Sequence, residues 1–92
     1  MAIHLNAEVH PDADVHSTAT IWSGTLIRES AVIGPETSIG RQSYVGPGVR
    51  IGANCKVQNH ALVYEPAVIE DGVFIGPGVV FTNDRFPRAV TV

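Results

Sequence analysis

A six-residue repeat constrains the fold of this chain more than any other feature. Large apolar residues recur at every sixth position: Ile3, Val9, Val15, Ile21, Ile27, Ile33, Ile39, Val45, Ile51, Val57, Val63, Ile69, Ile75 and Phe81. From Val9 onward, a small or β-branched residue stands two positions before each, as at Ala31, Thr37 and Cys55. A fixed short period of this kind is typical of repeat architectures.

The spacing within each repeat indicates strands rather than helices. Residues two apart share one face of a strand, whereas a period of six does not fit the 3.6-residue period of a helix. Glycine often follows the large apolar residue, and we expect it to turn the chain. Three six-residue sides close one triangular coil, so the chain makes about five coils. The sequence therefore predicts an all-β fold, a parallel β-helix filled with stacked aliphatic side chains.

The repeat ends near the end of the chain. Position 87, where the next large apolar residue is expected, is Pro87. We therefore predict a hexapeptide-repeat β-helix over residues 1–82 and a loop that leaves it over residues 83–92. Loops that project from a rigid scaffold often carry functional residues.

Composition excludes several classes of protein. The 92 residues form one domain at most, and their net charge of −3 argues against a nucleic-acid-binding protein. No apolar run reaches the roughly 18 residues of a membrane span, and the N-terminus lacks the features of a signal peptide. The single cysteine, Cys55, occupies an inward position and is expected to pack in the core. We expect a soluble, cytoplasmic chain that contacts neither membrane nor nucleic acid.

Three of the four histidines have a regular spacing that raises the possibility of a metal site. His4, His10 and His16 are six residues apart, so they point outward from three different sides of the coil. They cannot converge on one ion, and we predict no metal site and a packing or surface role for them. His60 stands apart, in the polar segment 58–66. This segment is either a solvated surface or a ligand-binding edge, where an imidazole could accept a proton or bond a sugar.

Three stretches, 58–65, 69–77 and 80–89, give the chain a more specific resemblance. The repeat resembles the left-handed β-helix acyltransferases, and these stretches are similar to the nucleotide-sugar N-acetyltransferases, especially the UDP-2-acetamido-3-amino-2,3-dideoxyglucuronate N-acetyltransferases. The similarity covers about the first half of such an enzyme. It implies left-handed coils, although parallel crossovers are normally right-handed. It also implies acetyl transfer from acetyl-CoA to the amino group of a UDP- or dTDP-linked amino sugar for bacterial surface polysaccharide synthesis.

The resemblance also implies a set of site residues. Asn83 matches the family's active-site asparagine, and its side-chain amide can orient the attacking amine. His60, Asn59 and Tyr64 are expected to contact the substrate. His60 and Asn83 follow strands of different sides, and family members are homotrimers in which such corners meet between subunits. In the family, later coils supply much of the acetyl-CoA surface, so a second hypothesis is a truncated, non-catalytic β-helix module used for trimerisation.

Overall fold

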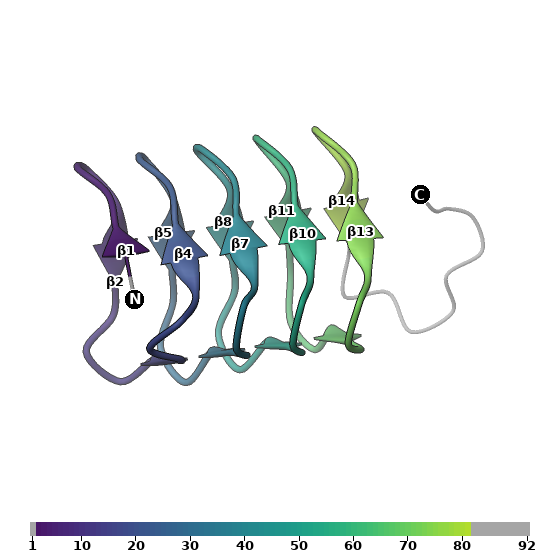
Figure 1. The fold of residues 1–92 in the computed structure, drawn as a ribbon, viewed down its shortest axis with the longest axis horizontal. Coiled ribbons are helices and arrows are strands. Elements are labelled where there is room, and N and C mark those ends of the chain that lie inside the picture. The colour runs from purple at the N-terminus through teal and green to yellow at the C-terminus, as the bar shows by residue number, and fades with distance from the viewer. Residues whose placement is uncertain (1, 82–92) are drawn as a thin grey trace.

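The computed structural model describes residues 2–81, which form a single stack of short strands and no helix (Figure 1). No helix in this part of the chain could cross a membrane. The predicted loop 83–92 lies outside the described residues. Each strand is two residues long and ends on a large apolar position of the repeat: β1 (Ala2–Ile3), β2 (Glu8–Val9), β3 (Asp14–Val15), β4 (Thr20–Ile21), β5 (Leu26–Ile27), β6 (Val32–Ile33), β7 (Ser38–Ile39), β8 (Tyr44–Val45), β9 (Arg50–Ile51), β10 (Lys56–Val57), β11 (Leu62–Val63), β12 (Val68–Ile69), β13 (Phe74–Ile75) and β14 (Val80–Phe81).

Three parallel sheets form the sides of the triangle. Their orders are β1-β4-β7-β10-β13, β14-β11-β8-β5-β2 and β12-β9-β6-β3. Each strand pairs with the strand 18 residues away, as in Ile21 with Ile39. In Figure 1 the chain rises along β4, crosses at the top and descends behind along β5 while it advances toward the C-terminus. This is a left-handed parallel β-helix, as predicted, and its fourteen strands make between four and five coils, slightly fewer than the expected count.

The large apolar residues form the core. In the central coils Ile21, Ile27, Ile39 and Val45 are fully buried. In these coils the residue two positions before each large apolar residue is also buried. Where this residue is polar, its side chain hydrogen-bonds to the next coil. The Thr25, Thr37 and Ser43 hydroxyls donate to the carbonyls of residues 40, 52 and 58. As a result, no buried side-chain polar atom of residues 2–81 lacks a partner.

Cys55 occupies the same inward position and is fully buried. Its thiol donates to the carbonyl of Glu70 at 3.1 Å. The prediction that this cysteine packs in the core is confirmed.

The glycines that follow the large apolar residues have a different role from the one expected. The residue with left-handed backbone stands two positions further on, as at Glu36 and Gln42. Gly34 and Gly40 are needed because adjacent coils come close together. A Cβ on Gly34 would lie 2.6 Å from the carbonyl carbon of Gly52, and one on Gly40 would lie 2.7 Å from a backbone atom of the next coil. Close approach, not turn conformation, explains these glycines.

Candidate functional site

The turns of successive coils stack into three edges. The one at the top of Figure 1 is called the upper edge here and comprises residues 4–7, 22–25, 40–43, 58–61 and 76–79. A hollow of about 320 Å³ lies along it. Its lining consists of Asn6, Ser23, Gly24, Arg41, Gln42, Asn59 and His60. Two of the residues predicted to bind substrate, Asn59 and His60, thus lie together on one hollow.

Asn59 is tied to the neighbouring coil. Its side-chain oxygen Oδ1 accepts the backbone N–H of Arg41 at 2.9 Å, and its own carbonyl accepts the N–H of Gly78 at 3.0 Å. The side-chain oxygen is therefore engaged in joining coils, and a ligand in the hollow would meet the rest of the amide.

His60 also bonds to the backbone of Arg41. Its backbone has a φ of 63°, and its N–H donates to the carbonyl of Arg41 at 2.8 Å. Asn59 and His60 therefore hold the peptide groups on both sides of Arg41, while the His60 imidazole is exposed.

Arg41 and Gln42 were not among the predicted site residues. The signal that could have found them is the 18-residue register, which places position 41 beside position 59 and position 42 beside position 60. The hollow has room because Gly24 has no side chain. A Cβ there would lie only 2.8 Å from Cγ of Gln42.

Tyr64 lies elsewhere, on the edge formed by residues 10–13, 28–31, 46–49 and 64–67. Its ring packs against Tyr44, with centroids 5.2 Å apart and planes tilted by 46°. Arg28 Nη1 donates to the Tyr44 hydroxyl at 3.4 Å. Within one chain, the structure therefore separates Tyr64 from Asn59 and His60.

An ion pair stands beside this tyrosine pair. Arg28 Nε lies 3.0 Å from the carboxylate of Glu29. The pKa of Glu29 is lowered by its own backbone N–H and by the Arg28 guanidinium, which both donate to the carboxylate. The pKa of Arg28 is raised, chiefly by the same hydrogen bond.

The three N-terminal histidines lie on three different edges of the triangle. His4 stacks on Trp22, with ring centroids 4.2 Å apart, which confirms a packing role for it. Nδ1 of His10 and of His16 accepts the backbone N–H of the residue two positions later. Within residues 2–81, no group of three or more His, Cys, Asp or Glu side chains could hold a metal ion. Asn83 lies outside the described residues.

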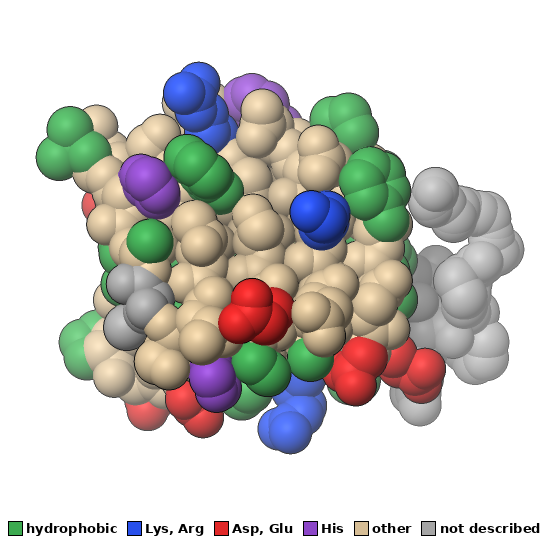
Figure 2. All heavy atoms as spheres, in the orientation of Figure 1, with side chains coloured by type: hydrophobic (Ala, Val, Ile, Leu, Met, Phe, Trp, Pro, Cys, Tyr) green, Lys and Arg blue, Asp and Glu red, His purple; other side chains and the backbone are tan. Residues whose placement is uncertain are grey.

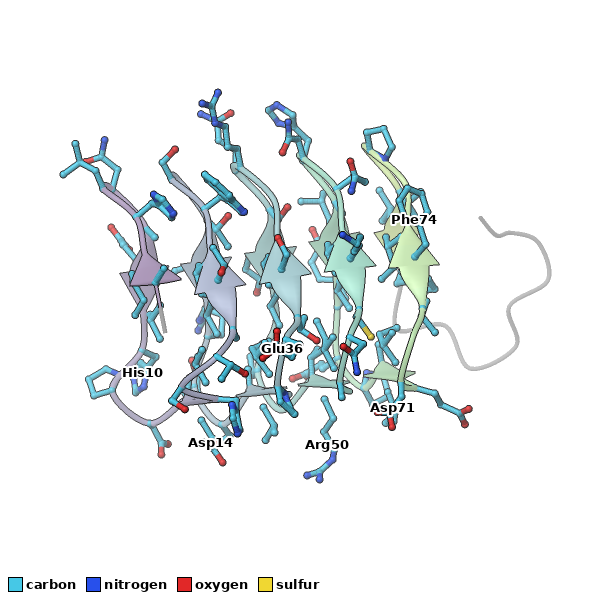
Figure 3. The ribbon with its side chains drawn as sticks, in the orientation of Figure 1. His10, Asp14, Glu36, Arg50, Asp71 and Phe74 are labelled. Atoms are coloured by element: carbon cyan, nitrogen blue, oxygen red, sulfur yellow. The ribbon has the colours of Figure 1, made fainter. Side chains whose placement is uncertain are left out.

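A larger and more open groove, of about 710 Å³, runs over β6, β9 and β12. Outward side chains of these strands, Val32, Arg50 and Val68, line it together with Glu70 and Asp71 at the adjoining turn. Asp71 is committed to the fold, because its Oδ1 accepts the N–H of Ala53 at 2.8 Å. In Figure 3 the Arg50 side chain extends away from the sheet.

Comparisons with known proteins bear on the fold. Residues 30–65 match the model of the bacterial transferase hexapeptide family, described as six repeats. No curated protein matches the chain. Among solved structures, the chain is similar to a perosamine N-acetyltransferase from Caulobacter crescentus, determined in complex with CoA and GDP-perosamine. That likeness has 20% identity and a TM-score of 0.39 over 87% of this chain. The chain spans 50% of that structure's length.

Proposed function

We propose that this chain is the acceptor-side part of an acetyl-CoA-dependent sugar N-acetyltransferase. Its substrate would be the amino group of a UDP- or dTDP-linked amino sugar, in bacterial surface polysaccharide synthesis in the cytoplasm. One observation carries the proposal: a hexapeptide β-helix whose central coils, residues 30–65, match a family of bacterial transferases. Those coils include Arg41, Asn59 and His60 of the upper edge.

The chain's residues supply positioning in this proposal. A sugar amine attacks an acetyl group only as the free base, so its lone pair must be presented unprotonated. Asn83 would orient the amine through its side-chain carbonyl. The exposed His60 imidazole and the Asn59 amide would bond sugar hydroxyls, and Tyr64 would contact the substrate from its own edge.

Acetyl-CoA is the proposed acetyl donor. The basic side chains of residues 2–81 are Arg28, Arg41, Arg50 and Lys56. They stand on different faces or edges of the triangle, and Arg28 is paired with Glu29. The described coils therefore offer no cluster of positive charge for the phosphates of CoA, and we assign none of these residues to its binding.

A homotrimer forms part of the proposal. Four of the five strands in the sheet β14-β11-β8-β5-β2 present apolar or aromatic side chains outward, and only Glu8 on β2 is charged. The four are Leu26, Tyr44, Leu62 and Val80. The central strands of the sheet β1-β4-β7-β10-β13 instead present Thr20, Ser38 and Lys56, between Ala2 on β1 and Phe74 on β13. Packing of the apolar column against a partner would bury it and could bring two different edges together between subunits.

The test of catalysis is acetyl transfer itself. Acetyl-CoA is mixed with UDP- or dTDP-linked 3-amino sugars, and release of the CoA thiol is followed over time. We expect thiol release with an amino sugar and none with the matching 3-hydroxy sugar, and we expect Asn83→Ala to abolish it. If a longer natural version with further coils is inactive on every such sugar, the proposal is wrong.

Activity and oligomeric state together distinguish the proposed enzyme from the alternative, a non-catalytic trimerisation module. A chain that is inactive but trimeric by light scattering would favour the non-catalytic trimerisation module, which the apolar column on β5, β8, β11 and β14 also supports. A monomer would contradict both the proposed homotrimer and that module. Leu62→Lys places a charge in the column and should dissociate the trimer, whereas Ser38→Lys on β7, in a different sheet, should not.

A further inference from the structure

Carboxylates are distributed unevenly over this acidic molecule. The chain has nine Asp and Glu residues, yet none occurs in the five turns that make up the upper edge, residues 4–7, 22–25, 40–43, 58–61 and 76–79. The other two edges carry Asp12, Glu29 and Glu65, and Glu36, Glu70 and Asp71. Figure 2 shows basic and histidine side chains but no acidic ones along the top of this face. The acidic side chains lie lower, where Figure 3 labels Asp14, Glu36 and Asp71 together with His10 and Arg50.

The upper edge also holds its basic residue in a fixed place. The N–H of Arg41 is bound by Asn59 Oδ1 at 2.9 Å, and its carbonyl by the His60 N–H at 2.8 Å. These two hydrogen bonds therefore fix the backbone of Arg41 at the rim of the 320 Å³ hollow. The rest of the lining is hydroxyl, amide, imidazole and glycine, all without negative charge.

We propose that the upper-edge hollow binds an anionic group, a phosphate or a carboxylate, carried by a sugar-sized ligand. Arg41 would contact the anion with a guanidinium that is always charged and presents paired N–H donors. Gln42 and His60 line the same hollow and would add further hydrogen bonds. Toward the anion, Asn59 is a positioning residue, because its Oδ1 acts through the backbone of Arg41. The inference rests on the edge alone and holds whether or not the chain transfers acetyl groups.

Direct binding tests the proposal. Trp22 is the only tryptophan and adjoins Ser23 in the lining, so its fluorescence can report on the hollow. The chain is titrated with glucose 6-phosphate, glucuronate and glucose, with amide chemical shifts as a second readout. We expect at least one of the two charged sugars to bind, with shifts at residues 41, 42 and 60, and glucose to bind at least about tenfold more weakly. Binding of only one charged sugar would identify the anion as phosphate or carboxylate.

Matched variants distinguish binding at this site from non-specific attraction between the anion and any positive charge on the chain. Arg41→Gln should weaken binding about tenfold or more, whereas Arg50→Gln, which removes an exposed arginine on another face, should leave it unchanged. Asn59→Asp keeps an oxygen for the Arg41 N–H but places a carboxylate on the edge. It should lower affinity by a similar factor while the melting temperature stays near that of the parent.

Three results would overturn the inference. One is equal affinity for glucose and the charged sugars. The second is equal loss in Arg41→Gln and Arg50→Gln. The third is no binding of either charged sugar by the parent chain. Asn59→Asp decides the matter if Arg41→Gln fails to fold, because binding that survives the added carboxylate also contradicts an anion site.

Discussion

The first coil and the central coils carry the same repeat, yet they are buried very differently. Ile3 on β1 is 44% exposed, whereas Ile33 on β6 is 1% exposed, although both occupy the large apolar position. Ile33 has a coil on either side, with Val15 and Ile51 as its partners in register. Strand β1 pairs only with β4 among the described strands. In this fold the burial of a residue is set by its neighbouring coils, so one substitution should have a different effect in each coil.

The largest effect is expected from shortening a central column residue. Ile33→Ala opens a cavity between two coils and should lower the free energy of unfolding by about 3–4 kcal/mol. Ile3→Ala removes the same atoms from an exposed position and should cost less than about 1 kcal/mol. Urea denaturation of both variants measures the difference. Equal costs would show that the first coil is as well covered as the centre.

A smaller effect is expected from the bonds that link coils through the core. Thr37 donates to the carbonyl of Gly52 at 2.6 Å and accepts the N–H of Cys55 at 3.1 Å. Thr37→Val keeps the shape but leaves both groups buried without a partner, which should cost about 2–3 kcal/mol. The control is Thr20→Val, on the outward face of β4, which should change stability by less than about 0.5 kcal/mol. A neutral Thr37→Val would mean that water or a rearranged coil replaces the hydroxyl.

Replacing glycine by alanine should lower the stability of the fold in one coil and raise it in another. A Cβ on Gly40 would meet backbone atoms of residues 58 and 59 at 2.7 Å, so Gly40→Ala should destabilise by about 2 kcal/mol. On Gly76 the nearest atom would be Val79 Cγ2 at 3.7 Å. Gly76→Ala should therefore stabilise by about 0.5 kcal/mol, because it restricts the unfolded chain. Melting temperatures that fall equally in both variants would contradict close approach as the reason for Gly40.

The smallest effect is expected from the exposed ion pair between Arg28 and Glu29. The pKa of Glu29 is lowered in the folded chain, so its ionised form stabilises the fold above its unfolded-state pKa. That contribution is lost as the pH falls through the folded-state pKa. Glu29→Gln should flatten this part of the acid-side stability profile and change the melting temperature little at neutral pH. A large loss at neutral pH would show that the Arg28–Glu29 pair does more than an exposed ion pair usually does.

The sequence predicted the interior of this molecule better than its edges. The six-residue period identifies the column residues, and the fold follows because Ile21 must meet Ile39 when three sides close a coil. The period does not show which polar side chains reach across to the next coil. One example is Asn59, whose Oδ1 accepts the backbone N–H of Arg41. Another example is Tyr64, which is near His60 in sequence but lies on another edge, because strand β11 runs between them.

The strict 18-residue register has a consequence for changes in length. Deleting or inserting a single residue shifts every later side chain out of its inward or outward position, and it destroys the contact between positions such as 41 and 59. Inserting a whole coil of 18 residues preserves each existing type of contact and adds one more turn to every edge. Chains of this kind can therefore grow or shrink during evolution in whole coils, and the upper-edge hollow would lengthen by one turn at each step.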